Sequence, residues 1–370
     1  MKHDLLTPLW TAEAPPRLSL RDWERLLSQA RCARLTGRLA LWFSDRAVLD
    51  QVPEAPRRHL ESALREVRRL QDQTRWEADC LRRALAALPT PIVFLKGAAY
   101  VLADLPPARG RLFVDVDLLV AREHLRDVEM ALFAAGWVAQ RLDPYDDRYY
   151  RDLMHELPPM QHVERGTALD VHHTLTPPTS RFAIRVEPLL AAARPLPDQP
   201  RLSTLAPADM VLHSAVHLMQ DGEHGAALRD VLDIADLVRA FEADASFWPA
   251  LLARARELAY GEVLLDVLQQ ARRVAALQLP ADVEAALRAM APRTWRNRLM
   301  AKLLAEAMRP MHPDCEAPIT GLCRWLLYVR AHWLRMPWYQ ILPHLARKAW
   351  RRARGGSRDT ATANPLGVRP

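Results

Sequence analysis

Apolar residues recur every three or four positions through the first 88 residues of the chain, a spacing typical of amphipathic helices. The pattern predicts helices over residues 18–27, 30–45 and 56–87, with Arg and Glu between the apolar positions. Ser19 can cap the first helix, and Pro53 and Pro56 separate the second from the third. Residues 1–88 are therefore interpreted as a helical scaffold without chemistry of its own.

Short, continuous apolar runs replace this spacing after residue 89. They predict strands over residues 92–95, 112–120, 137–142, 160–163 and 168–172, with helices over 98–103 and 122–135. Gly136 follows the second of these helices, where glycine is a common stop. The alternation of strands and helices predicts an α/β block over residues 89–175.

Helical spacing returns after Pro207. It predicts helices over residues 208–220, 226–243, 248–258, 263–277 and 281–308, a loop over 310–318, and an aromatic, basic helical region over 322–354. Residues 355–370 are expected to form a disordered tail. The predicted domains are an N-terminal helical region (1–88), a sheet-containing core (89–200), a C-terminal helical domain (201–316) and a basic end (317–370).

The composition narrows the class of protein. Only 12 of the 370 residues are Gly, which favours helix, and the four cysteines form no C-x-x-C pair, so neither a zinc site nor a disulfide framework is expected. The sequence shows no signal-peptide pattern and no apolar run long enough to cross a membrane. A cytoplasmic location is the expectation.

The net charge of +7 is unevenly distributed. Residues 317–370 contain ten Lys and Arg but one acidic residue, so the rest of the chain is close to neutral. Three interpretations of this basic end stay open: a helix lying on an anionic membrane surface, a nucleic-acid contact, or a packed helix with solvated arginines. The first would place the protein at the inner membrane surface.

Two acidic residues interrupt the apolar run over residues 112–120. Because alternate side chains of a strand share a face, Asp115 and Asp117 project together. Paired carboxylates repel unless a cation lies between them, and Mg²⁺ takes carboxylate oxygens together with substrate phosphates. If the strand over 168–172 is a neighbour, Asp170 becomes a third carboxylate, with His172 on its face. The alternative is a pair of aspartates facing water.

Basic residues and a glycine flank this acidic strand. Lys96 and Gly97 end the strand over 92–95 and open a helix, a junction with free N–H groups and a cation, as phosphate binding requires. Arg111, four residues before Asp115, could add a phosphate contact.

These motifs, in this order, resemble those of the nucleotidyltransferase superfamily with the polymerase-beta-like fold, and more narrowly those of the bacterial family of uncharacterised nucleotidyltransferases. The resemblance covers about residues 85–245. The matching segments are Leu95–Gly97, Arg111 with residues 115–120, residues 155–158 and Asp170–His172. Lys96–Ala98 stands where the wider superfamily has Gly-Ser or Gly-Gly.

The resemblance implies an α+β fold, with a mixed β-sheet core flanked by helical regions at both ends. It also implies a metal-dependent nucleotidyltransferase that moves a nucleoside monophosphate from a nucleoside triphosphate to an acceptor hydroxyl and releases pyrophosphate. Asp115, Asp117 and Asp170 would be catalytic and would hold Mg²⁺ or Mn²⁺. The nucleotide-binding residues would be Lys96, Gly97, Arg111, His172, His217 and Arg229. The acceptor is expected to be a small molecule or a protein rather than a nucleic acid.

Several alternatives accompany this interpretation. One is a non-catalytic nucleotide- or partner-binding protein on the same fold, and another is a glycosyltransferase that uses Asp115 and Asp117. His213 and His217 have the i, i+4 spacing of a metal pair but suit a packed pair better. Arg229 and Asp233 have the spacing of an ordinary helix ion pair.

Overall fold

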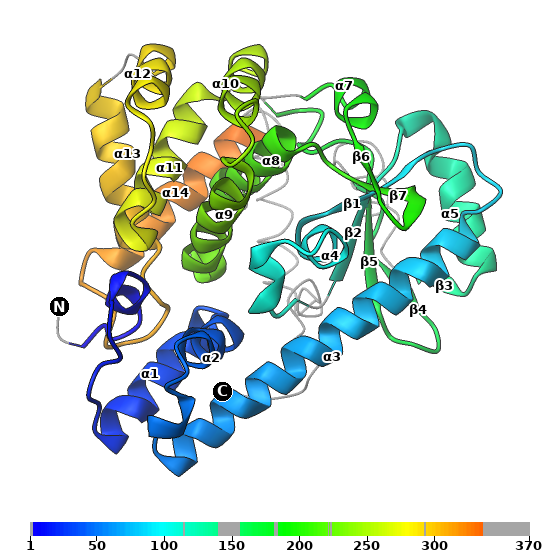
Figure 1. Cartoon of the computed structure of the whole chain (residues 1–370). Helices are drawn as coiled ribbons and strands as arrows, with labels where there is room; N and C mark the ends of the chain where they lie inside the picture. Colours follow the sequence, from blue (N-terminus) through cyan, green and yellow to red (C-terminus); the bar gives the residue numbers. More distant parts are fainter. Residues whose placement is uncertain are drawn as a thin grey trace, which may run out of the picture.

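The computed structural model describes residues 3–113, 115–139, 156–180, 184–220, 222, 224–291 and 294–335. It contains one seven-stranded mixed sheet with helices packed around it, which confirms the predicted α+β class (Figure 1). The strand order is β3-β4-β5-β2-β1-β7-β6.

The N-terminal region is helical, as predicted. After a 3-10 turn at Thr7–Thr11 come α1 (Leu20–Cys32), α2 (Thr36–Asp45), a second turn at Leu49–Gln51 and α3 (Glu54–Ala84). The side chain of Ser19 accepts a hydrogen bond from the Asp22 N–H, so the predicted cap is confirmed. Figure 1 shows α3 as one long helix that runs from the N-terminal helices toward α5 and the edge of the sheet.

The central strands are β1 (Ile92–Leu95), β2 (Asp115–Leu119) and β5 (Ala168–His172). β1 pairs antiparallel with β2, and β2 pairs parallel with β5. All four β1 residues are buried, as the continuous apolar run predicts. On one side the sheet continues through β4 (Met160–His162) to β3 (Trp137–Ala139).

Two strands on the other side were not predicted. β7 (Gln199–Thr204) pairs parallel with β1, and β6 (Arg194–Leu196) closes that edge. Pro195 and Pro200 interrupt their apolar pattern, and proline is tolerated only at such edges and strand starts. The sheet therefore extends to Thr204, past residue 200.

Short helices join the strands. They are α4 (Lys96–Leu102), 3-10 turns at Pro106–Arg109 and Arg122–His124, α5 (Leu125–Ala134) and α7 (Glu187–Ala191). α4 packs against β1 and β2 and lies in front of them in Figure 1.

The C-terminal half is a helical layer beside the sheet. It comprises α8 (Pro207–Gln220), a turn at His224–Ala226, α9 (Ala227–Phe241), α10 (Phe247–Glu257), α11 (Gly261–Ala275), α12 (Ala281–Met290), α13 (Thr294–Ala307) and α14 (Thr320–Arg335). The single helix predicted over 281–308 is thus two helices, because α12 ends at Met290, two residues before Pro292.

Residues 336–354, the rest of the predicted basic helical region, and the predicted tail lie outside the described residues. Within the described part of the chain, no helix has both the length and the apolar character needed to cross a bilayer.

Candidate active site

The three predicted aspartates lie on one face of the central strands. Asp117 on β2 is the register partner of Asp170 on β5, and Asp115 precedes Asp117 by two residues. Register partners in neighbouring strands point to the same side of a sheet, as do residues two apart. The condition set by the sequence, that the two acidic strands be neighbours, is met.

Lys96 lies over the Asp117 carboxylate. β1 and β2 pair so that Leu95 is opposite Asp117, and Lys96 follows directly. Its Nζ is 3.2 Å from Asp117 Oδ1. Burial disfavours the charged amine, but the carboxylates of Asp117, Asp115 and Glu156 raise the pKa of Lys96 above its ordinary value. Lys96 is therefore a fixed cation within the site.

The backbone takes an unusual conformation at Lys96. Lys96 has φ +46°, in the left-handed region that residues other than glycine rarely adopt. Next to it, a Cβ added at Gly97 would lie 2.9 Å from the Phe113 ring, so only glycine fits there without a shift. The structure thus explains Gly97 by packing, and its phosphate contact stays a prediction.

His172 lies on the other side of Asp117. Its Nε2 is 2.9 Å from Asp117 Oδ1, and its Nδ1 is 3.4 Å from Glu156 Oε2. Burial lowers the pKa of His172, but the carboxylates of Asp117 and Glu156 raise it by more than burial lowers it, so the pKa lies above its ordinary value. The imidazole therefore links two carboxylates and stabilises the charge on Asp117.

Glu156 is the functional candidate that sequence reasoning missed. It appeared only as a member of the matching segment 155–158, because no strand or motif placed it near the aspartates. In the structure Glu156 forms an isolated antiparallel bridge with His172, which brings its carboxylate to the site. The only sequence signal was its place in that segment; His155 lies outside the described residues.

The carboxylates of the site have pKa values pushed in opposite directions. Burial opposes ionisation of Asp117, but Lys96 and His172 outweigh it and lower its pKa. Burial and the charges of Glu156 and Asp117 raise the pKa of Asp170, and burial with Asp117 raises that of Asp115. Asp117 is therefore ionised, whereas Asp170 readily holds a proton.

The predicted metal ligands are brought together but do not form a ready cage. Among the described residues, no group of three or more His, Cys, Asp or Glu side chains is arranged to hold a metal ion. Lys96 and His172 both contact Oδ1 of Asp117. The donor type does fit: three carboxylates on one face, with mutual repulsion that a hard divalent cation would relieve.

Helix α8 places two histidines near the aspartates. Burial, together with the positive charges of Lys96 and His172, lowers the pKa of His213 to about 3, so its imidazole is neutral. The charge on His217 lowers the pKa of Asp117, which places His217 near the acidic face. The rings of His213 and His217 meet edge to face with centroids 6.3 Å apart, as in a packed pair.

A family model described as "uncharacterised nucleotidyltransferase" matches residues 19–276, which include all seven strands and helices α1 to α11. The chain belongs to this family. Searches of curated proteins and of solved structures found no match. Membership assigns the protein to the nucleotidyltransferases, a class of transferases, and argues against the glycosyltransferase hypothesis.

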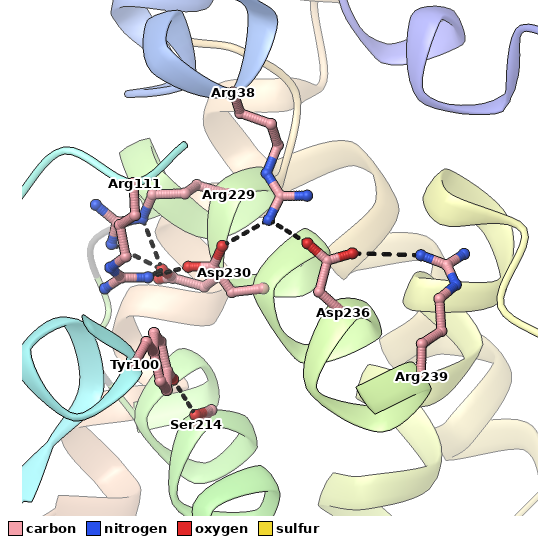
Figure 2. Close-up of polar contacts among 9 residues, drawn as sticks. Arg38, Tyr100, Arg111, Ser214, Arg229, Asp230, Asp236 and Arg239 are labelled. Carbon is pink, nitrogen blue, oxygen red and sulfur yellow. Dashed lines mark hydrogen bonds and ion pairs between the residues drawn. The ribbon is translucent and has the colours of Figure 1, made fainter. Parts of the chain in front are cut away.

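Arg111 lies in a buried cluster of charged side chains that it forms with residues of α9 (Figure 2). The Arg111 guanidinium donates to Asp233 and lies 3.5 Å from Asp230 Oδ1. It also lies 5.6 Å from the Tyr100 ring centroid, and the Tyr100 hydroxyl is 2.8 Å from Ser214 Oγ. Arg111 thus links α9 to the loop before β2, and its phosphate contact stays a prediction.

The predicted ion pair between Arg229 and Asp233 is wrong. Arg229 donates to Asp230 instead, at 2.7 Å, while Asp233 accepts from Arg38 at 2.9 Å and from Arg111. Helix α9 is buried here, so arginines from α2 and from the loop before β2 reach Asp233. Arg38 also binds Asp236 at 2.7 Å, as Figure 2 shows.

Proposed function

We propose that this nucleotidyltransferase joins a nucleoside monophosphate to an acceptor hydroxyl, using a nucleoside triphosphate and Mg²⁺ or Mn²⁺. The observation that carries the proposal is the register pairing of Asp117 on β2 with Asp170 on β5. Asp115 lies two residues before Asp117 on the same strand. Three carboxylates on one sheet face are the donor set that such a cation binds. Asp115, Asp117 and Asp170 would hold the metal, which would offset the negative charge of the phosphates.

The protein's own groups have distinct roles in this proposal. Lys96 is a cation beside the acidic face and contacts the triphosphate. Lys96 and His172 keep Asp117 ionised, and Glu156 holds the His172 ring. A bound divalent cation would favour the ionised form of Asp170, whose pKa is otherwise raised, and the carboxylate would then take the proton from the acceptor hydroxyl. The hydroxyl oxygen forms a bond to the α-phosphorus, the bond from that phosphorus to the bridging oxygen breaks, and pyrophosphate leaves.

Two further residues, His217 and Arg229, belong to the proposed nucleotide site. His217 is near Asp117 from α8, and its role at the rim of the nucleotide stays within the proposal. Arg229 is paired with Asp230 on α9, and its contact with the nucleotide stays within the proposal. The acceptor we propose is a small molecule or a protein.

The test measures release of pyrophosphate and transfer of labelled nucleotide with each nucleoside triphosphate, Mg²⁺ and a cell extract as the source of acceptor. Asp117→Asn should abolish both signals, and Asp170→Asn should lower both by roughly 10²–10⁴-fold. The matched control is Asp72→Asn on α3, because the Asp72 side chain is 84% exposed. Transfer that persists in both site variants would refute the proposal.

A non-catalytic binding protein is the second candidate. It is favoured by the contacts of Lys96 and His172 with Asp117, which leave no formed metal cage among the described residues. Saturable nucleotide binding by calorimetry, without pyrophosphate release under any condition, would support this candidate over the first.

A further inference from the structure

Helix α14 has an apolar stripe on each of two faces. One stripe is buried and consists of Cys323, Leu327 and Ala331, where α14 packs on α8 and α13. The other is exposed and consists of Leu322, Trp325, Leu326 and Val329, which we call the outer stripe. Its residues follow the i, i+3, i+4, i+7 spacing and are 39% to 58% exposed. A helix that is apolar on both sides normally has a partner on both sides.

The charge around the outer stripe selects the partner. Helix α14 contains no Asp or Glu. Helix α13, which packs on α14, exposes the cations Arg296, Arg298 and Lys302. Helix α14 itself adds Arg324 and Arg330. A complementary partner is therefore apolar and anionic.

Tryptophan in the stripe points to a lipid surface. Trp side chains favour the boundary between headgroups and acyl chains, where an apolar ring and a polar N–H are both satisfied. A helix with an apolar stripe and nearby cations lies in this boundary, and anionic lipid strengthens its binding to the membrane. The family match ends at residue 276, so α14 is an addition to the matched part of the chain.

We propose that the outer stripe of α14 docks the protein on an anionic lipid surface, with the helix axis in the membrane plane. The helix lies in the part of the molecule remote from β3 and α5, so docking leaves the opposite edge of the sheet facing water (Figure 1). This inference does not depend on the reaction proposed above.

The experiment measures co-sedimentation of the full chain with phosphatidylcholine vesicles, with and without phosphatidylglycerol. The wild type should bind the anionic vesicles and should be released as salt rises, because salt screens the attraction. Trp325→Glu combined with Val329→Glu should weaken binding at least about tenfold, since it removes two apolar contacts and adds two negative charges.

The matched control is Met130→Glu combined with Phe133→Glu on α5, where both side chains are more than 60% exposed. This control should bind anionic vesicles like the wild type. A second measurement uses vesicles that contain brominated lipid, which quenches tryptophan fluorescence on contact. The quenched fraction should be larger in the wild type than in the conservative variant Trp325→Phe, which lacks the tryptophan of the outer stripe.

Three results would overturn the proposal. The first is equal vesicle binding by the wild type and the α14 double variant. The second is absence of vesicle binding in a wild type that is dimeric by light scattering and becomes monomeric in the variant, which would assign the stripe to a second copy. The third is stripe-dependent binding of single-stranded RNA without vesicle binding.

Discussion

Asp117 and Asp170 are register partners on two parallel strands, although 52 residues separate them in the chain. Their carboxylates lie side by side on one face of the sheet. Lys96 and His172 contact the Asp117 carboxylate, and Glu156 is close to that of Asp170. This relationship generates the first three predictions.

Asp170→Asn should separate activity from stability. If Asp170 is the general base, pyrophosphate release should fall by roughly 10²–10⁴-fold. The free energy of unfolding at neutral pH should rise, because the raised pKa of Asp170 means that ionising it costs folding energy. Urea unfolding and the transfer assay measure the two effects. A variant that loses both activity and stability would instead make Asp170 a structural residue.

Lys96 and Asp117 should show strong energetic coupling. Lys96→Met removes the cation that most favours the charge on the buried Asp117 carboxylate, and should destabilise the protein by about 3–5 kcal/mol. Adding Asp117→Asn should recover much of that loss. A double-mutant cycle by urea unfolding should give a coupling of about 1–3 kcal/mol. Additive single effects would mean that the 3.2 Å contact contributes nothing.

Glu156→Gln should slow catalysis through His172. The amide keeps the shape of the carboxylate but removes the charge that raises the pKa of His172. By analogy with outer-shell groups at metal sites, kcat should fall by about 10- to 100-fold while the nucleotide KM changes little. Glu164→Gln, on an exposed residue of the same region, is the control and should leave kcat unchanged.

Asp233→Ala should destabilise the protein more than any surface change on α9. It leaves Arg38 and Arg111 short of a buried acceptor, with an expected loss of about 3–5 kcal/mol in the free energy of unfolding. Glu242→Ala, at the exposed end of α9, should cost less than about 0.5 kcal/mol. Similar losses in the two variants would show that the cluster does not support the fold.

Asp266 on α11 should give the stability a pH dependence outside the site. Burial raises its pKa from 3.8 to about 7. Between these values the folded state binds a proton that the unfolded state does not, so stability falls as pH rises through this window. Asp266→Asn should remove the part of this fall that Asp266 causes and raise the free energy of unfolding at pH 8 by about 4 kcal/mol. Parallel pH profiles for wild type and variant would contradict the assignment.

The central part of the fold could be predicted because its strands are continuous apolar runs. The apolar run over residues 92–95 coincides with β1, and the run over residues 112–120, which includes Asp115 and Asp117, contains β2. β6 and β7 could not be predicted in the same way, because prolines and polar residues break their pattern and β7 gains its place by pairing with β1.

The aspartates of the site follow from strand geometry, whereas their partners do not. Alternation puts Asp115 and Asp117 on one face, and neighbouring strands add Asp170. The contacts of Glu156 and of Arg111 depend on where distant elements pack. Arg229 shows the same limit, because helical spacing favoured Asp233 as its partner whereas tertiary contacts gave Asp233 to Arg38 and Arg111.

The contact between Arg38 and Asp233 also limits how early the N-terminal helices can fold while the chain is being synthesised. The two residues are 195 positions apart, so α2 emerges from the ribosome long before its partner on α9 exists. Until then Arg38 has no buried acceptor on α9, and the N-terminal helices cannot complete their final packing. The contact between α2 and α9 can therefore form only after most of the protein has been translated.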